Sequence, residues 1–322
     1  MFKTTNQTTK RNFIRVLKFS IFLLVIVMLV KTIDRSIVEF QKADLDLRSL
    51  DFRKLLLTAG LYCLGLLSFA YMWHRALRIL KQSPSLSESF GSYFLSQLGK
   101  YVPGKALVVV IRSERVKSKR TTLGSAITAV FIETLSMMAV GAVLGGLLIF
   151  LFGSGPKDSS LLWISGLLAF AAGVPSAPPV FRAVIGYLSH RKIRSNLSED
   201  VKNVTLQTMA PCWLVGIIGW LLLGGSMCAC LSAIPAELFT TPFKAADFGV
   251  ITASVALALV AGFISLIPGG AGVREYIILT LLAGPYGIVV ATVVAILVRL
   301  IWLATEVVMA SVFYILMTRS KL

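Results

Sequence analysis

Residues 123–152 read LGSAITAVFIETLSMMAVGAVLGGLLIFLF, a run in which Glu133 is the only charged side chain. As an α-helix this run would extend about 45 Å at 1.5 Å per residue, more than the roughly 30 Å of a bilayer's hydrocarbon core. A helix that is apolar on all sides must be buried on all sides, in a large protein core or in lipid. The run therefore predicts a helix that crosses a membrane.

The composition of the whole chain favours lipid over water as its main solvent. Of the 322 residues, 56% are hydrophobic and 15% are charged, and the mean hydropathy is +0.82. Soluble domains average about 25% charged residues. The first apolar run follows a basic stretch and has no small-residue cleavage site after it, so we interpret it as an uncleaved signal anchor. We predict an all-α polytopic bundle with six full crossings, at residues 19–30, 55–71, 123–152, 161–180, 212–234 and 288–317.

Two further apolar segments, 85–111 and 250–282, are interrupted in the middle by Pro-Gly sequences at 101–104 and 268–272. Non-helical backbone at membrane depth is stable only where protein or a water-filled cavity surrounds it. The helix after the second break rises only about 12 Å before the turn signal at 284–287, which is less than half a hydrocarbon core. The breaks therefore predict two re-entrant hairpins.

Basic residues are concentrated on one predicted side of the membrane. The stretches assigned to the cytoplasm are 1–18, 74–120, 181–202 and 318–322, and they carry 22 basic and 4 acidic residues. The stretches assigned to the outside carry 8 of each. Because Lys and Arg in short loops fix the orientation of a membrane protein, we expect a cytoplasmic (inner) membrane protein with both termini in the cytoplasm. These loops account for the net charge of +17, so we expect no nucleic-acid partner.

The chain lacks the residues that metal or redox chemistry needs. Its four cysteines lie inside apolar runs, it has only two histidines, and no nucleotide or nucleophile motif is present. We therefore expect no metal site, no cofactor and no catalytic residues.

The chain aligns with itself at an offset of about 165 residues, which superposes the two Pro-Gly breaks. About 30 residues after each break comes an ionisable residue in a predicted membrane helix, Glu133 in the first copy and Arg299 in the second. In the predicted topology these two helices run in opposite directions. We therefore expect one transmembrane domain built from two inverted pseudo-repeats, 1–160 and 161–322, the plan of many secondary transporters. The alternative is coincidence, since Pro and Gly are frequent in membrane helices.

Five charged side chains, Glu133, Arg274, Glu275, Arg299 and Glu306, lie at predicted membrane depth. Each costs at least a few kcal/mol there unless it faces a partner or a cavity. Arg274 follows a glycine-rich break and opens a helix, so backbone N–H groups, the helix dipole and a guanidinium converge into an anion site. Arg299 and Glu306 share one helix face. We expect Glu133 and Arg299 to form a central pair.

These residues also have simpler interpretations, in which Glu133 and Glu306 only hold helices together and Glu275 caps the helix that Arg274 opens. The basic run 112–120 is expected to serve orientation and contact with anionic lipids. The predicted headgroup site also takes residues from the two breaks, which are Pro103, Gly104, Lys105, Pro268, Gly269, Gly270 and Gly272.

The run Leu266-Ile-Pro-Gly-Gly-Ala-Gly-Val-Arg274-Glu275, followed by Arg299 and Glu306, resembles the lysylphosphatidylglycerol-synthase transmembrane family, also called flippase-like. The resemblance covers roughly residues 61–317. It implies a lipid-handling domain that in known members moves an aminoacylated phospholipid across the bilayer or is linked to polyprenyl-lipid glycan pathways. It also implies a separate synthase or glycosyltransferase partner, since the soluble aminoacyl-transfer domain of fused members is not among these residues.

One departure from the family concerns the first break. Many relatives carry a Gly-Glu pair shortly after it, whereas here Lys105 is followed by Ala106 and an apolar run. How the first break selects a headgroup therefore stays open.

We expect a non-enzymatic protein that translocates an anionic or aminoacylated phospholipid, or a polyprenyl-linked lipid, through a polar cavity at the bilayer midplane. Arg274 and Arg299 would bind the phosphate, Glu133 and Glu306 would balance them or meet a cationic substituent, and the halves would rock about the breaks. One alternative is a membrane-embedded transferase, for which the sequence offers no suitably paired carboxylates outside the membrane core. The other is a non-transporting partner subunit of a cell-envelope assembly.

Overall fold

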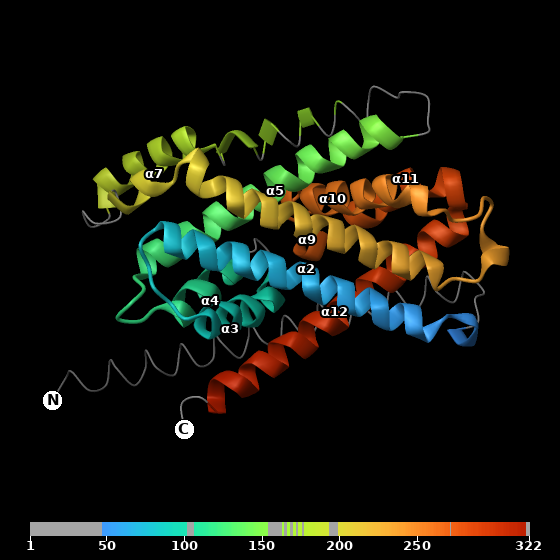
Figure 1. Ribbon diagram of the computed structural model, residues 1–322, viewed down its shortest axis with the longest axis horizontal. Helices are drawn as coiled ribbons and strands as arrows, with labels where there is room; N and C mark the ends of the chain where they lie inside the picture. The colour runs from blue at the N-terminus through green and yellow to red at the C-terminus, as the bar shows by residue number, and fades with distance from the viewer. Residues whose placement is uncertain are drawn as a thin grey trace, which may run out of the picture.

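The computed structural model describes residues 47–101, 106–153, 177–192, 199–270 and 272–319, with some of the residues between 163 and 175. Every regular element in this part of the chain is a helix, apart from one isolated bridge between Ser118 and Thr121 (Figure 1). The all-α prediction is confirmed. The predicted crossing at 19–30 and eight of the twenty residues of the one at 161–180 lie outside the described residues.

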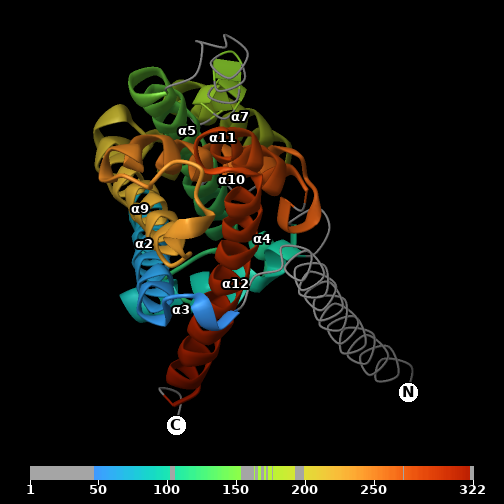
Figure 2. The same cartoon turned by 90° about the vertical axis from the view of Figure 1, so that its right-hand side faces the viewer.

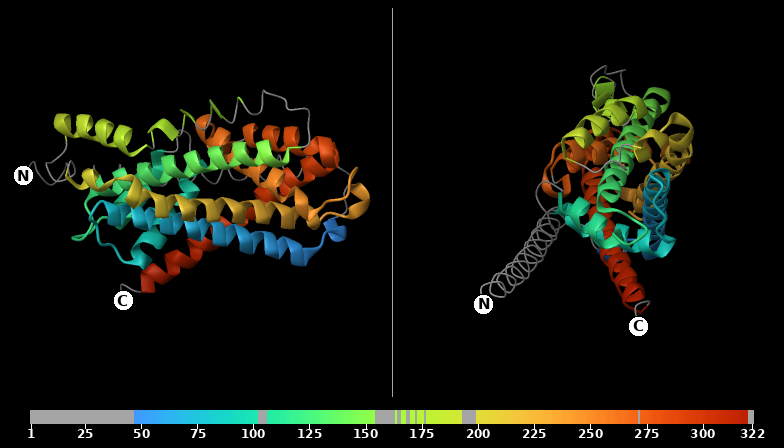
Figure 3. Two further views of the ribbon diagram at one scale, coloured as in Figure 1. Left: turned by 45° about the horizontal axis from the view of Figure 1, so that its top comes forward. Right: turned by 90° about the vertical axis from the view of Figure 1, so that its left-hand side faces the viewer.

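Among the described residues, five helices are long and apolar enough to cross a membrane. The five helices are α2 (Phe52–Ile79), α5 (Leu123–Phe152), α9 (Leu206–Ser232), α10 (Phe248–Ile264) and α12 (Ile288–Arg319). Helices α2, α5, α9 and α10 lie along the long axis of the molecule, and α12 crosses them obliquely (Figures 1 and 3). The predicted polytopic membrane bundle is therefore confirmed.

We call the end of the bundle where α2 finishes and α5 begins the basic end, because Lys81, Lys117, Lys119 and Arg120 lie there. The predicted cytoplasmic loop at 181–202 instead contains α7 (Pro178–Lys192) and the 3₁₀ turn η3 (Val201–Asn203). Proline is favoured at the first position of a helix, where its missing N–H costs nothing, and Pro178 occupies that position.

The first predicted hairpin is present. It consists of α3 (Leu86–Gln97), the 3₁₀ turn η2 (Leu98–Tyr101) and α4 (Ala106–Val116). These helices rise only about 18 and 17 Å, so neither crosses a bilayer. Its tip, which contains Pro103, Gly104 and Lys105, lies outside the described residues.

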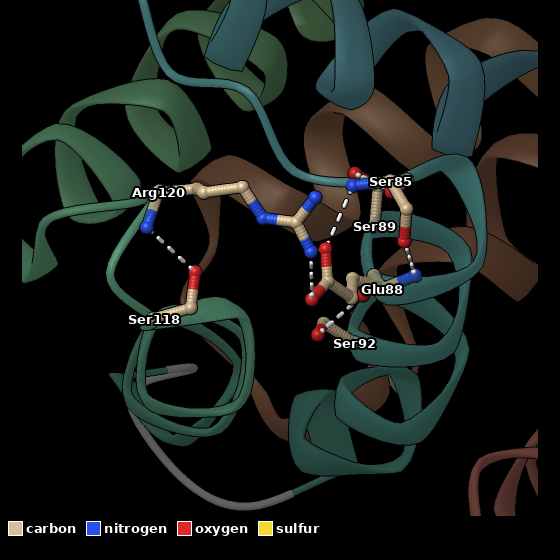
Figure 4. A network of polar contacts seen from close by, with 6 residues as sticks. All are labelled: Ser85, Glu88, Ser89, Ser92, Ser118 and Arg120. Carbon is tan, nitrogen blue, oxygen red and sulfur yellow. Dashed lines mark hydrogen bonds and ion pairs between the residues drawn. The ribbon is translucent and has the colours of Figure 1, made fainter. Parts of the chain in front are cut away.

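The base of this hairpin is closed at the basic end. The Glu88 carboxylate accepts from the backbone N–H of Ser85 at 2.7 Å and from Arg120 Nη2 at 3.4 Å, as Figure 4 shows. The hydroxyl of Ser85 accepts in turn from the Glu88 N–H at 3.1 Å, which completes a capping box. The hairpin therefore begins, with α3, and ends, with α4, on the same side of the bundle.

The second hairpin consists of α10, the 3₁₀ turn η6 (Pro268–Gly270) and α11 (Val273–Tyr286). The chain reverses at the break, where Gly269, Gly270 and Gly272 all have positive φ. At the far end from the basic end, Tyr286 Oη donates to Asp247 at 2.8 Å.

The arms of this hairpin are longer than predicted. Helix α10 rises about 26 Å and is itself long enough to cross, and α11 continues through Pro285. Proline in the last turn removes only one backbone hydrogen bond, so the turn signal at 284–287 does not end α11 before Tyr286.

Candidate functional site

The 3₁₀ turns of the two hairpins, η2 and η6, are in contact with each other beside α12, which runs obliquely past both hairpins (Figures 1 and 2). The Tyr101 ring in η2 packs on Gly269 in η6, where an added Cβ would lie 3.2 Å from Tyr101 Cδ1. A pocket of about 450 Å³, including its mouth, lies at this junction. Its lining combines charged and aromatic side chains with a few apolar ones, namely Tyr62, Lys100, Tyr101, Gly269, Arg274, Glu275, Ile278, Ala295, Val298, Arg299, Trp302 and Glu306.

The helix lengths place this pocket near the middle of the bundle. Arg299 lies 11 residues after the start of α12, a rise of about 17 Å, and Glu306 lies 13 residues before its end, about 20 Å. On α11, Arg274 lies 12 residues before Tyr286, about 18 Å from the end opposite the basic end. Charged groups at this depth are held only by partners or by water in a cavity.

Glu306 is enclosed by three donors from different parts of the fold. Its carboxylate accepts from Tyr62 Oη of α2, from Lys100 Nζ of η2, and from Tyr101 Oη at 3.2 Å. Only 1% of its side chain is exposed. Because these donors come from α2 and from η2, Glu306 ties α2 and the first hairpin to α12.

An aromatic stack between Tyr62 and Trp302 supports one of these donors. The rings of Tyr62 and Trp302 are parallel with centroids 4.5 Å apart, and Trp302 Nε1 donates to Ser226 Oγ at 2.9 Å. These contacts fix the Tyr62 hydroxyl that faces Glu306.

The second ion pair joins Glu275 to Arg299 and connects the second hairpin to α12. The Glu275 carboxylate also accepts from the backbone N–H of Gly272 at 2.7 Å, so it caps α11 as one interpretation of the sequence expected. Both side chains of this pair are 22% exposed. This pair is therefore more accessible than Glu306.

Arg274 has no charged partner among the described residues, and its Nε is buried without a hydrogen-bond acceptor. Of the other charges lining the pocket, Lys100 is paired with Glu306 and Arg299 with Glu275. Within the part of the chain that the structure describes, the pocket therefore carries one positive charge without a carboxylate partner. It also faces the start of α11, where the helix dipole is positive. This arrangement favours an anion.

Glu133 does not reach this pocket, so the predicted central pair with Arg299 is wrong. Glu133 accepts instead from Arg112 Nη1 at 2.7 Å and from Thr134 Oγ1 at 3.1 Å. Arg112 and Glu133 are 4% and 2% exposed. The alignment of the two halves predicted equal depth, but depth does not determine which way a side chain points around its helix.

The prediction that the basic run 112–120 contacts anionic lipids is wrong for Arg112. Its Nε donates to Ser96 Oγ at 3.0 Å, and its guanidinium lies over the Tyr93 ring at 4.2 Å from the centroid. It thus belongs to the interior of the first hairpin, because α4 returns to the basic end only at Val116.

Sequence reasoning missed Tyr62, Lys100, Tyr101, Trp302 and Arg112 as parts of polar clusters. Lys100 and Tyr101 had a signal, since they directly precede the first Pro-Gly break. The sequence gave no signal for Tyr62 and Trp302. An aromatic residue in an apolar run looks the same in the sequence whether it only packs or also donates a hydrogen bond.

Of the predicted glycines, Gly269 is buried and lines the pocket, Gly270 is buried against the Arg274 side chain, and Gly272 is the N-cap of α11 with φ +85°. The backbone of Pro268 opens η6. The structure thus brings together Arg274, Glu275, Arg299, Glu306 and the second break, and separates Glu133 from them.

The fold and this interior charged pocket define a polytopic α-helical membrane protein. A family model described as Lysylphosphatidylglycerol synthase TM region matches residues 15–310. The match covers most of the chain, so the protein belongs to that lipid-related membrane family, and the resemblance found in the sequence is confirmed. A comparison with curated proteins finds no match.

Proposed function

We propose that this protein moves a lipid across the cytoplasmic membrane by letting its headgroup pass through the pocket between the two hairpins. The lipid would be an anionic or aminoacylated phospholipid, or a polyprenyl-linked lipid. The uncompensated positive charge of Arg274 carries the proposal, because it lies at mid-bundle depth and lines a pocket. The name of the family, which refers to an aminoacylated phospholipid, supports it.

The physical requirement is a polar path for a charged group. An unpaired ion in hydrocarbon carries a Born cost of tens of kcal/mol, which two guanidinium contacts in a wet cavity largely remove. Arg274 would bind the phosphate first, since it has no competing carboxylate. Arg299 would bind the phosphate second, after its ion pair with Glu275 breaks.

The acidic partner for a cationic headgroup substituent would be Glu275. Glu306 already accepts from three donors and is almost completely buried, whereas Glu275 is 22% exposed beside the pocket. This reassigns the role that the sequence gave to Glu133 and Glu306.

The basic end would face the cytoplasm. Lys100 and Arg112 are interior, and removing them from the predicted cytoplasmic count of 22 leaves 20 basic residues against 4 acidic ones. The hairpins come from opposite ends of the bundle, which supports inverted halves 1–160 and 161–322 that rock about the breaks. The transfer chemistry would belong to a separate synthase or glycosyltransferase, and this chain would carry none.

The test is headgroup translocation by purified protein. Proteoliposomes of phosphatidylcholine would contain fluorescent phosphatidylglycerol or a labelled polyprenyl phosphate, and loss of outer-leaflet label would report crossing. Loss of a hydrogen bond to a charged group costs about 1.5–3 kcal/mol, so Arg274→Ala should slow crossing at least about ten-fold. Arg299→Ala should slow it as well.

The matched control is Arg120→Ala, which removes an arginine at the exposed base of the first hairpin, outside the pocket. With this variant, the labelled lipid should cross at the wild-type rate. Equal rates for wild type, Arg274→Ala and Arg299→Ala would remove the proposed roles. Incorporation of radiolabel into lipid by the purified protein would favour a transferase instead.

A further inference from the structure

The side chain of Arg274 lies across the contact between two glycines from different elements. A Cβ added to Gly262 in α10 would lie 2.8 Å from Arg274 Cγ and 2.9 Å from its Nε. A Cβ added to Gly270 in η6 would lie 2.7 Å from the same Nε. Cβ contacts below 3.0 Å are essentially never seen, so a side chain at either position would displace the flexible Arg274 side chain from its present place.

The backbone conformation of Gly262 does not require glycine. Gly270 has φ +67°, which favours glycine for conformational reasons alone, but Gly262 lies inside a regular helix. In a helix interior, alanine is favoured over glycine by about 1 kcal/mol. The residues that an alanine at 262 would meet most closely are Arg274 and the Gly270 backbone.

The two glycines also determine which part of Arg274 faces the pocket. They enclose its Nε, which is buried and has no acceptor. The contact with the pocket is therefore left to the terminal Nη groups, since Arg274 is half-buried and lines it. A guanidinium held at this end binds a phosphate with less loss of side-chain entropy than a free one.

We propose that Gly262 is a positioning residue, which holds the Arg274 guanidinium in place for the phosphate of a lipid headgroup. This inference rests on the proposed function and adds to it a residue outside the pocket lining. Through Gly262, helix α10 takes part in headgroup binding without touching the headgroup.

The experiment measures the crossing rate of fluorescent phosphatidylglycerol in phosphatidylcholine vesicles as its mole fraction is raised, which separates an apparent KM from a maximal rate. Gly262→Ala should raise the apparent KM by several-fold or more and leave the thermal unfolding midpoint near that of wild type. The control is Gly60→Ala on α2, where an added Cβ meets nothing within 4 Å, and it should match wild type.

The double variant distinguishes positioning from general damage. Arg274→Ala removes the Cγ and Nε that the new methyl group would strike, so Gly262→Ala should have no further effect in that background. If Gly262→Ala lowers the unfolding midpoint by steric strain, adding Arg274→Ala should restore the midpoint.

The outcomes separate the two proposals. If Arg274→Ala slows lipid crossing but Gly262→Ala has the wild-type apparent KM, the positioning role is overturned and the proposed function stands. A wild-type Arg274→Ala would overturn the phosphate role and the positioning role with it. An equal effect of Gly262→Ala with and without Arg274 would show that Gly262 acts by another route.

Discussion

At the scale of single residues, the interior of this protein is organised around two buried carboxylates, Glu306 and Glu133. Each is paired with a basic residue of the first hairpin, Lys100 and Arg112 respectively. Breaking a buried pair by removing one charge is costly, because the other charge remains without compensation. The two pairs therefore predict measurable losses of stability.

Glu306→Gln should destabilise the fold by about 3–5 kcal/mol, since it leaves the Lys100 ammonium without its counter-charge. The measurement is thermal unfolding of the purified protein in detergent. Glu237→Gln, which changes an exposed glutamate in η4 (Ala236–Leu238), is the control and should have little effect. An unchanged midpoint for Glu306→Gln would contradict the assignment of a buried charge pair.

Arg112 and Glu133 should be energetically coupled. Arg112→Met and Glu133→Gln should each destabilise by about 3–5 kcal/mol, and the double variant should lose clearly less than the sum. A double-mutant cycle on unfolding free energies measures this coupling. Additive losses would mean that the two side chains act independently despite their 2.7 Å contact.

The sequence predicted which charges lie at membrane depth, but it did not predict their partners. Arg274, Glu275, Arg299 and Glu306 gather at one pocket because the second break brings the start of α11 against α12. Glu133 pairs elsewhere because Arg112, which looked like the start of a surface basic run, comes back into the interior on α4. Pairing depends on rotation about each helix, and the apolar pattern of a lipid-facing helix carries little of that information.

At the scale of elements, the hairpins show where local sequence rules were sufficient. The Pro-Gly breaks predicted both hairpins, and at the second break Gly269, Gly270 and Gly272 have the positive φ angles that let the chain reverse. The lengths of the arms were harder to predict. Helix α10 is a full-length span because no residue between Phe248 and Ile264 interrupts it, and α11 continues past the Gly-Pro signal near its end.

The base of the first hairpin should contribute stability without affecting headgroup binding. Glu88→Ala removes the capping box with Ser85 and the contact with Arg120, and should cost about 1 kcal/mol. Both the unfolding midpoint and the apparent KM for fluorescent phosphatidylglycerol would be measured. A several-fold rise in KM with a normal midpoint would place this end of the hairpin in the translocation path.

At the scale of the whole molecule, the distribution of charge predicts orientation. Ser118→Cys places a thiol at the exposed basic end, and Glu237→Cys places one in the exposed turn at the opposite end. A membrane-impermeant thiol reagent should reach Ser118→Cys from the cytoplasmic side and Glu237→Cys from the outside. The native cysteines are buried or half-buried in membrane helices, so a variant without them is the background. Labelling of both positions from one side would contradict the topology.

The connections between the hairpins have a mechanical consequence. Each hairpin is tied to α12 by its own ion pair, and η2 touches η6 through the Tyr101 ring on Gly269. Among the described residues, no salt bridge joins one hairpin to the other. Helix α12 is thus the element to which both hairpins are joined, each by a separate ion pair. Under the proposed function, we expect one hairpin to move along α12 while the other keeps its ion pair, which would open the pocket toward one leaflet at a time.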